Sequence, residues 1–433
     1  MKHKKLLIAL MTVFTVLVAL FIFIMLWFWA DRYPDFSDFN AEAEIPDLKK
    51  GATPQGLASY KFYVPDENGE FTDTTKKQDY FFVSAYFKKQ ASRIYVIGRE
   101  TGYIGYVTLK GLDGTSDFTG HCGGVAINDQ TLWVASGSSE AGKGNVYVYK
   151  EDGYTNVVSS IISKARENGE IAFKNKFAAN CNASFLYYYR ANPDGNSASY
   201  QDRLYLGEFY RSGNYETDKN HYITTPAGNK NKAFVYEFNV STDSGNIYGL
   251  ERLTDSKLSD DNKVPKIQKI FSVTDEIQGF ARTTDGKLVL SQSYGLKNSH
   301  LYYHDWSKIV SDDNKQTTTI GGKDYLNWYN YASDSAAGEN FAYEGVKSNS
   351  GAQYTVSDLK VYFIDSKNTS KPNKTLIRDY SIPSMSEGLC VIKENGTERV
   401  CVLFESGAKK YKTFVRQITD EIYSFVPRQK TRR

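Results

Sequence analysis

The sequence predicts an all-β protein, a five-bladed β-propeller that follows one N-terminal transmembrane helix. Three observations predict this fold: an uncharged segment at 6–30, a motif that recurs five times between 54 and 405, and a composition with 33 Tyr and 25 Phe. In each copy a small residue opens a short apolar strand, a turn follows, and a second apolar strand ends in a polar residue. Such a unit cannot bury its own apolar face, so it must stack on its neighbours.

The N-terminal segment has the properties of a membrane anchor. Residues 6–30 carry no charge and follow Lys2, Lys4 and Lys5. Their length suits a helix that crosses a bilayer better than the shorter core of a cleaved signal peptide, and Trp27 and Trp29 suit the membrane interface. We therefore expect a single-pass signal anchor in the cell membrane, with residues 1–5 cytoplasmic, 6–30 transmembrane and the C-terminal domain extracellular.

After the anchor, the sequence predicts an acidic stalk at 31–50, one propeller at 51–426 and a basic tail at 427–433. The stalk is also a candidate to lend a strand that closes the ring. The net charge is +3, which the three lysines before the anchor supply, so the rest of the chain carries no net charge. Nucleic-acid binding normally requires a basic stripe, and we therefore expect no nucleic-acid partner.

The five copies of the motif open the five predicted blades, at 55–58, 123–126, 182–185, 278–281 and 387–390. The strands are expected in runs rich in β-branched and aromatic residues between turn residues. They are 81–86, 92–98 and 103–110 in the first blade, 125–128, 131–136, 145–150 and an outer strand near 154–159 in the second, 184–189, 203–210, 233–240 and 266–274 in the third, and 280–284, 287–293, 359–364 and 374–382 in the fourth.

Three further segments interrupt this plan. A helix is expected at 161–168, because it is the one helix-like stretch after the anchor. Long polar segments at 210–230 and 300–357 interrupt the third and fourth blades and lack paired apolar strands. We expect both to be loops, and the alternative is a sixth blade within 300–360.

The fifth blade contains the clearest hairpin signal, an Asn-Gly pair at 395–396, which is the preferred two-residue turn between antiparallel strands. Counting outward from this turn pairs Cys390 with Cys401, and either a cross-strand disulfide or two free buried thiols fits that pairing. Cys122 and Cys181 occupy the same place in consecutive blades. We predict that these two cysteines form a disulfide.

In a propeller the innermost strand begins, and the next strand ends, on one face of the wheel. Polar residues at these positions should therefore converge around the mouth of the central channel, where ligand sites gather. The predicted ring has as inner members Gln55, His121, Asn180, Asn182, Gln278 and Glu387, with Glu276 close by, and as outer members Ser84, Tyr86, Ser136, Glu208, Tyr210, Gln292, Tyr294, Glu405 and Ser406. The predicted ligand-binding residues are Gln55, Asn180, Asn182, Gln278, Glu208, Gln292, Tyr86, Tyr210, Tyr294 and Glu405.

Two kinds of chemistry fit this ring. Glu387, Asn182 and Gln278 supply oxygen donors of the kind that calcium takes, although the same groups could instead bond the backbone at the strand ends. His121 is the candidate for acid–base catalysis, because it would face Glu387 or Glu208 across the channel. The alternative is a histidine that bonds a neighbouring blade. The sequence contains no Gly-x-Ser-x-Gly, His-Glu-x-x-His or phosphate-loop motif.

The stretch from Gln-Gly-Phe-Ala at 278–281 to 293, together with Ser-Glu-Gly-Leu at 386–389, resembles the blade-opening pattern of gluconolactonase-like and related bacterial propellers. The resemblance implies a calcium ion held over the channel by a Glu from such an opening, which is Glu387 here. Three functions stay open: a propeller whose channel face binds a glycan or cell-wall component, a calcium-dependent hydrolase or lyase using Glu387 and His121, and a platform that binds a protein on its insertions.

Overall fold

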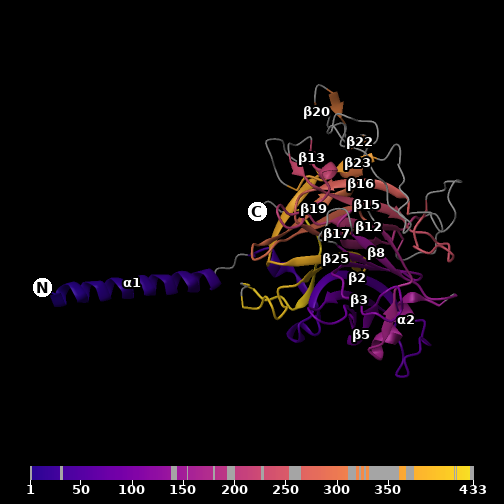
Figure 1. Ribbon diagram of the computed structural model, residues 1–433, viewed down its shortest axis with the longest axis horizontal. Helices are drawn as coiled ribbons and strands as arrows, with labels where there is room; N and C mark the ends of the chain where they lie inside the picture. The colour runs from indigo at the N-terminus through magenta and orange to yellow at the C-terminus, as the bar shows by residue number, and fades with distance from the viewer. Residues whose placement is uncertain are drawn as a thin grey trace.

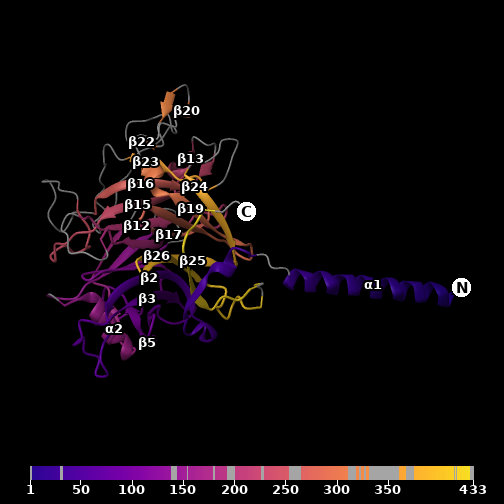
Figure 2. The ribbon, with the colours of Figure 1, turned by 180° about the vertical axis from the view of Figure 1, so that it is seen from behind.

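The computed structural model describes residues 2–29, 33–137, 144–153, 155–178, 181–192, 200–225, 229–252, 265–310, 318–320, 323–325, 328–330, 360–366, 375–413, 415 and 417–429. The first helix, α1 (Lys2–Trp29), projects away from a body made mostly of strands (Figure 1). Its Ile8–Met25 stretch is long and apolar enough to cross a membrane. The view from behind shows the same separation of helix and body (Figure 2).

The body is a ring of sheets, each of which begins with one inner strand. The inner strands are β2 (Thr53–Tyr63), β6 (Cys122–Ile127), β11 (Ala183–Tyr189), β17 (Ile277–Arg282) and β25 (Ser386–Glu394). They contact one another in a closed cycle, from β2 through β6, β11, β17 and β25 back to β2. This cycle confirms the predicted five-bladed propeller.

The other strands continue each blade outward from its inner strand. Blade 1 adds β3 (Lys77–Tyr86), β4 (Arg93–Gly98), β5 (Gly102–Lys110) and β9 (Glu170–Ala172); blade 2 adds β7 (Leu132–Ser136), β8 (Asn145–Tyr149) and β10 (Asn175–Ala178); blade 3 adds β12 (Arg203–Glu208), β15 (Ala233–Asn239), β16 (Ile267–Val273), β23 (Lys360–Phe363) and β22 (Trp328–Asn330). Blade 4 adds β18 (Lys287–Gln292), β19 (Ser299–Asp305) and β24 (Leu376–Ile382), and blade 5 adds β26 (Thr397–Phe404), β27 (Glu421–Phe425) and β1 (Asn40–Glu44).

Short elements lie in the connections between these strands. They are the helices α2 (Val157–Arg166) and α3 (Trp306–Val310), the 3-10 turns η1 (Phe36–Asp38), η2 (Leu48–Lys50) and η3 (Lys219–His221), and the paired strands β13 (Ile223–Thr224) with β14 (Lys230–Asn231) and β20 (Thr318–Ile320) with β21 (Lys323–Tyr325). The segment predicted as a stalk supplies β1, which pairs antiparallel with β27. The last blade therefore takes one strand from each end of the propeller, and this shared sheet closes the ring.

The glycine in the repeated motif is required by the close approach of neighbouring inner strands. A Cβ atom added to Gly56 of β2 would lie 2.6 Å from the Val125 amide nitrogen of β6, and one added to Gly124 of β6 would lie 2.3 Å from the Leu186 nitrogen of β11. Gly388 of β25 meets β2 in the same way. Real Cβ atoms do not approach backbone this closely, so a side chain at these positions would push the blades apart.

The same motif contains a β-bulge in every blade. The pairing of each inner strand with the second strand shifts by one residue at Gln55, Gly123, Ser184, Gln278 and within 387–388. A bulge leaves one residue out of the ladder and re-aims its side chain. The repeat seen in the sequence is therefore a repeated bulge at the mouth of the channel.

One prediction for the outer part of blade 2 is wrong. The segment near 154–159 enters helix α2 instead of forming the outer strand, and β10 takes that position. Val157 and Ile161 are four residues apart and both buried, and the Asn156 side chain accepts a hydrogen bond from the Ser159 amide at 3.1 Å. The helical spacing and this N-cap outweigh the strand preference of the β-branched residues.

Blade 4 corrects a second prediction. Its third strand is β19, which lies at the start of a segment predicted to be a loop, whereas the predicted strand at 359–364 contains β23 and belongs to blade 3. There β23 runs parallel to β16, with Val361 opposite Ile270. The six residues between β18 and β19 form an ordinary hairpin connection. His300 and His304 within β19 weaken its apolar pattern.

The cysteines correct a third prediction. The Asn-Gly hairpin forms as predicted and places Cys390 opposite Cys401. All four cysteines are free and buried, so the predicted Cys122–Cys181 disulfide is absent, and Cys390 and Cys401 follow the alternative of two free buried thiols. Cys122 packs into the cluster between blades 1 and 2, and Cys181 into the cluster between blades 2 and 3. Their equivalent places therefore direct the two thiols into different parts of the core.

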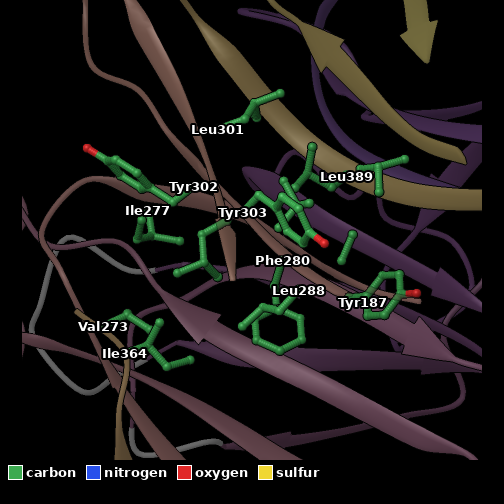
Figure 3. Close-up of a cluster of buried hydrophobic side chains, with 14 of the residues drawn as sticks. Tyr187, Val273, Ile277, Phe280, Leu288, Leu301, Tyr302, Tyr303, Ile364 and Leu389 are labelled. Carbon is green, nitrogen blue, oxygen red and sulfur yellow. The ribbon is translucent and has the colours of Figure 1, made fainter. Parts of the chain in front are cut away.

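The core lies between the blades, and its largest cluster joins blades 3, 4 and 5. Figure 3 shows Tyr187 of β11, Phe280 of β17 and Leu389 of β25 together in this cluster. Tyr205 of β12 stacks on Phe280, with ring centroids 4.5 Å apart. The Tyr and Phe residues that enrich the sequence thus serve mainly as packing between adjacent sheets.

Candidate functional site

A cavity of about 530 Å³ lies where the inner strands begin. Its walls come from all five blades, both from the bulged openings and from the connections that follow second strands. The lining residues are Gln55, Tyr86, Thr119, His121, Gly137, Asn182, Ser184, Phe209, Tyr215, Gln278, Ser293, Tyr294, Gly295, Met385, Glu387, Glu405 and Tyr411. The structure therefore brings together eight of the predicted site residues, namely Gln55, Tyr86, His121, Asn182, Gln278, Tyr294, Glu387 and Glu405.

The bulges account for much of this convergence. Gln55, Ser184 and Gln278 are the residues left out of the ladder in three blades, and Glu387 lies in the bulge of a fourth. All four line the cavity. The sequence motif identifies three of them, whereas Ser184 was expected only as the first residue of the strand 184–189 and was not among the predicted site residues.

Glu208 is buried inside the protein instead of lining the cavity. Its side chain is fully buried and accepts hydrogen bonds from the backbone amides of Asn182 at 3.3 Å and Phe234 at 2.9 Å. The Nδ1 atom of His221 lies 2.8 Å from its Oε2 atom. Glu208 therefore joins the end of β12 to the inner strand and to the insertion of blade 3.

Gln292 and Tyr210 are also buried away from the cavity. Gln292 donates through Nε2 to the Asp275 carbonyl at 2.7 Å and accepts from the Tyr302 hydroxyl at 2.6 Å. The Tyr210 hydroxyl accepts from the Lys232 ammonium at 3.1 Å. Asn180, the remaining predicted ligand-binding residue, lies outside the described residues.

Two carboxylic acids, Glu387 and Glu405, share the cavity. Glu387 is the second residue of β25, and Glu405 follows the last residue of β26. Ser386 pairs with Phe404, so the two acids lie side by side at one end of a hairpin. Gln278 donates to Glu387 at 3.4 Å, and Gln55 donates to Glu405 at 3.1 Å.

Burial makes ionisation of this pair unfavourable. Burial first, and then the charge of Glu405, raise the pKa of Glu387 well above its usual range. Burial raises the pKa of Glu405 to about 7, against the opposing effect of the Lys410 ammonium. Neighbouring acids that cannot both ionise hold a proton near neutral pH. The cavity therefore contains a proton donor and a proton acceptor in one place.

His121 and Tyr86 form a second part of the wall. Their rings meet edge to face with centroids 4.7 Å apart, and the Lys410 ammonium donates to the Tyr86 hydroxyl at 2.6 Å. The His121 side chain is exposed to the cavity. Desolvation by the surrounding protein first, and then the positive charge of Lys410, lower the pKa of His121. Both His121 and Glu387 line the cavity, and among the described residues no hydrogen bond joins them, so the acid–base pair stays a prediction.

An aromatic wall completes the cavity, and the sequence predicted only one of its members. Phe209 stacks on Tyr294 at 6.2 Å and meets Tyr215 edge to face at 5.5 Å. The Arg211 guanidinium lies 3.4 Å from the centre of the Tyr294 ring. Phe209, Tyr215 and Tyr411 come from irregular connections. Phe209 lies in the predicted strand 203–210, between two predicted site residues, whereas no repeated motif marks Tyr215 and Tyr411.

The described side chains do not favour the calcium hypothesis. Glu387, Asn182 and Gln278 do line one cavity, but calcium takes six to eight oxygen atoms. No group of three or more His, Cys, Asp or Glu residues suited to a metal occurs in the described part of the chain. Gln278 directs its amide nitrogen to Glu387, and Lys410 already supplies positive charge near both acids. We therefore derive no step through a metal.

Comparison with known proteins gives likeness to solved propeller enzymes only at low identity. No family model and no curated protein matches the chain. The PQQ-bound aldose sugar dehydrogenase of Streptomyces coelicolor aligns at 10% identity with a TM-score of 0.35, covering 89% of this chain and 96% of that chain. A GH43_1 enzyme from Xanthomonas citri aligns at 9% with a TM-score of 0.37, covering 87% and 91%. RS223-Beta-xylosidase aligns at 8% with a TM-score of 0.38, covering 90% and 94%.

Proposed function

We propose that the protein is a membrane-anchored, extracellular propeller that binds a carbohydrate in the cavity at the mouth of its channel. The composition of the cavity wall carries this proposal. The rings of Tyr86, Phe209, Tyr215, Tyr294 and Tyr411 share one cavity with two glutamine amides, an asparagine and two carboxylic acids. This combination of flat apolar surfaces and polar groups of both donor and acceptor type suits a sugar.

The chemistry of a sugar ring explains why both kinds of group are needed. Its C–H face packs on an aromatic ring, while its hydroxyl groups both donate and accept hydrogen bonds. The amides of Gln55 and Gln278 can donate to a hydroxyl oxygen, and Glu387 and Glu405 can accept from a hydroxyl hydrogen. A volume of about 530 Å³ lies within the ordinary range for ligand sites.

The membrane part of the proposal rests on α1 and the charges around it. The Ile8–Met25 stretch is apolar enough to span a bilayer, and Lys2, Lys4 and Lys5 precede it. Positive residues favour the cytoplasmic side. The propeller then lies on the outer side of the membrane, where glycans and cell-wall components are found.

The pair of acids supports a second candidate function, hydrolysis of the bound carbohydrate. Glycoside hydrolysis needs one carboxylic acid that holds a proton and one carboxylate that does not. Glu387 and Glu405 share the cavity, and burial raises the pKa of both acids, so one of the pair can hold a proton while the other is ionised. If this is correct, Glu387→Gln abolishes the release of reducing sugar but retains binding.

Binding of the full chain, in detergent, to a glycan array tests the main proposal. We expect retention of at least one glycan, and Tyr86→Ala and Tyr294→Ala each to weaken it about tenfold, equivalent to about 1.4 kcal/mol. Tyr103→Ala is the matched control, because Tyr103 is an exposed tyrosine of β5 outside the cavity. Absence of any retained glycan, or equal binding by all three variants, contradicts the proposal.

A further inference from the structure

The segment that follows α1 is docked at the rim of the cavity. The Tyr33 side chain is only 7% exposed, and its hydroxyl donates a hydrogen bond to the Asn298 side chain at 3.2 Å. Asn298 belongs to the 293–298 connection, which also supplies Tyr294 and Gly295 to the cavity wall. Three residues later, the Phe36 ring packs edge to face on Phe404 at 5.8 Å. These contacts fix the start of the propeller chain beside the mouth of the cavity.

The chain between α1 and this docked segment is short. The helix ends at Trp29, so four peptide steps reach Tyr33. At about 3.6 Å for each extended step, the distance is at most about 14 Å. The headgroup region on each side of a bilayer is roughly 5–8 Å thick. If α1 spans the membrane, the rim that holds Tyr33 therefore lies close to the headgroups, whatever path residues 30–32 take.

The same face has most of the exposed large apolar side chains of the described propeller. Outside α1 there are six such residues, and four of them, Leu112, Tyr215, Leu296 and Ile418, lie in connections that also line the cavity. The other two are Tyr103 and Tyr200. Leu296 is 59% exposed. Apolar side chains on one rim suit contact with a membrane interface.

Positive charge accompanies these apolar side chains. Lys297 follows Leu296, and Lys409, Lys410 and Lys412 lie in the 405–420 connection with Ile418. Lysines near a bilayer are attracted to anionic headgroups. In both views the yellow 405–420 connection lies on the side of the body from which α1 projects (Figures 1 and 2).

We propose that the cavity mouth is turned toward the membrane that holds α1, and that its ligand is the sugar headgroup of a membrane glycolipid instead of a free polymer. This proposal rests on the proposed carbohydrate binding. It identifies the membrane as the source of the sugar. Because at most about 14 Å of chain separates the end of α1 from the docked Tyr33, a headgroup at the bilayer surface can reach the cavity. Anchoring also raises the effective concentration of such a ligand.

The orientation can be tested without any ligand. A fluorophore is attached to Leu296→Cys or to Tyr103→Cys in the full chain reconstituted in vesicles, and the four native cysteines, being buried, leave the introduced thiol as the reactive one. A nitroxide on the lipid headgroup serves as the quencher. We expect several-fold stronger quenching at position 296 than at 103. A flexible Gly/Ser insertion of about 20 residues before Tyr33 should reduce the quenching at 296 to the level at 103. Equal or reversed quenching in the uninserted chain overturns the proposal.

The source of the sugar is tested with two probes of the same headgroup. The reconstituted full chain is given vesicles containing diglucosyl diacylglycerol, or the corresponding free disaccharide in solution, and competition with a fluorescent glycan from the array is measured. Stronger competition by the lipid form, reduced by the Gly/Ser insertion, supports the proposal. Competition by the free disaccharide alone overturns the lipid source and leaves carbohydrate binding intact. Failure of all glycans to bind overturns the proposed function itself, even if position 296 lies at the membrane.

Discussion

Glu208 and Glu387 are both buried glutamates at repeated positions of the blades, but their surroundings differ. Both oxygens of Glu208 accept from backbone amides, and His221 contacts one of them. Within the described part of the chain, the Glu387 side chain has one long hydrogen bond, at 3.4 Å, from Gln278, and it lines the cavity with Glu405. Two different repeated positions thus carry an acid, and the partners of each acid decide whether it holds the fold together or remains available to a ligand.

The largest expected effect comes from the satisfied acid. Glu208→Gln places an NH₂ group against one of the two backbone amides that Glu208 accepts from, leaving a buried donor without an acceptor. We expect the free energy of unfolding to fall by about 3 kcal/mol, measured by denaturant titration of the full chain in detergent. Glu387→Gln is the matched control and should cost less than about 1 kcal/mol. Equal losses in the two variants would show that partners do not distinguish these acids.

His304 extends the comparison to a buried base with few partners. Its Nδ1 atom lies 3.2 Å from the Thr375 hydroxyl, and within the described residues its Nε2 atom has no partner. Burial lowers the pKa of His304 from 6.5 to about 3. The unfolded chain therefore binds a proton below pH 6.5 that the folded protein does not bind, and stability is lost as the pH falls through this window.

The expected loss of stability follows from the difference between the pKa values of His304 in the unfolded and folded states. At pH 5 the group should lower the free energy of unfolding by about 2 kcal/mol relative to pH 7. His304→Phe removes the titrating group with similar volume, so its stability should fall less between pH 7 and 5. Denaturant titrations of both proteins at the two pH values provide the measurement. Parallel pH profiles would mean that His304 accepts a proton in the folded state.

The ring around the channel could be predicted because it follows from a repeat, and its exceptions arise from contacts that no repeat encodes. Gln55, Gln278 and Glu387 occupy the bulges, so one motif places them together. Glu208 occupies the same position of the pattern as Glu405, but its side chain is buried in the protein and does not line the cavity, because the insertion of blade 3 brings His221 into contact with it. A residue 13 positions away in a polar connection gives no sequence signal for that contact.

The same reasoning explains which strands could not be placed. The closed cycle of five inner strands follows from the spacing of the small residues, since each must admit a neighbouring backbone. The exchange of β19 and β23 does not follow, because both are short apolar runs beside a long insertion and either could pair with blade 4. Lys410 and Tyr411 likewise lie outside the repeat, although they set the charge and the wall of the cavity.

The two acids of the cavity should have the opposite pH dependence to His304. Burial raises the pKa of Glu405 from 4.5 to about 7, so the folded protein holds a proton that the unfolded chain releases. This contribution to stability is complete below pH 4.5 and is lost as the pH rises through 7. Glu405→Gln should therefore be more stable than the unchanged protein at pH 8, by about 1 kcal/mol. Denaturant titrations at pH 5 and 8 give the difference, and a variant less stable at pH 8 would place Glu405 among the structural acids.

The smallest expected effect concerns Lys410, the exposed cation that opposes the burial of both acids. Lys410→Met keeps the length of the side chain and removes its charge, so the pKa of both acids should rise further, and only slightly because solvent screens the charge of Lys410. The loss of stability with rising pH begins at the pKa of the unfolded chain, which is unchanged, and should continue to a slightly higher pH in the variant. High salt should abolish the difference between the two proteins, because it screens Lys410 in the unchanged chain. If the pH profile of stability instead moves to lower pH, another cation must stabilise the ionised acids in place of Lys410. The difference between Glu208 and Glu387 would then arise from nearby charge more than from hydrogen-bond partners.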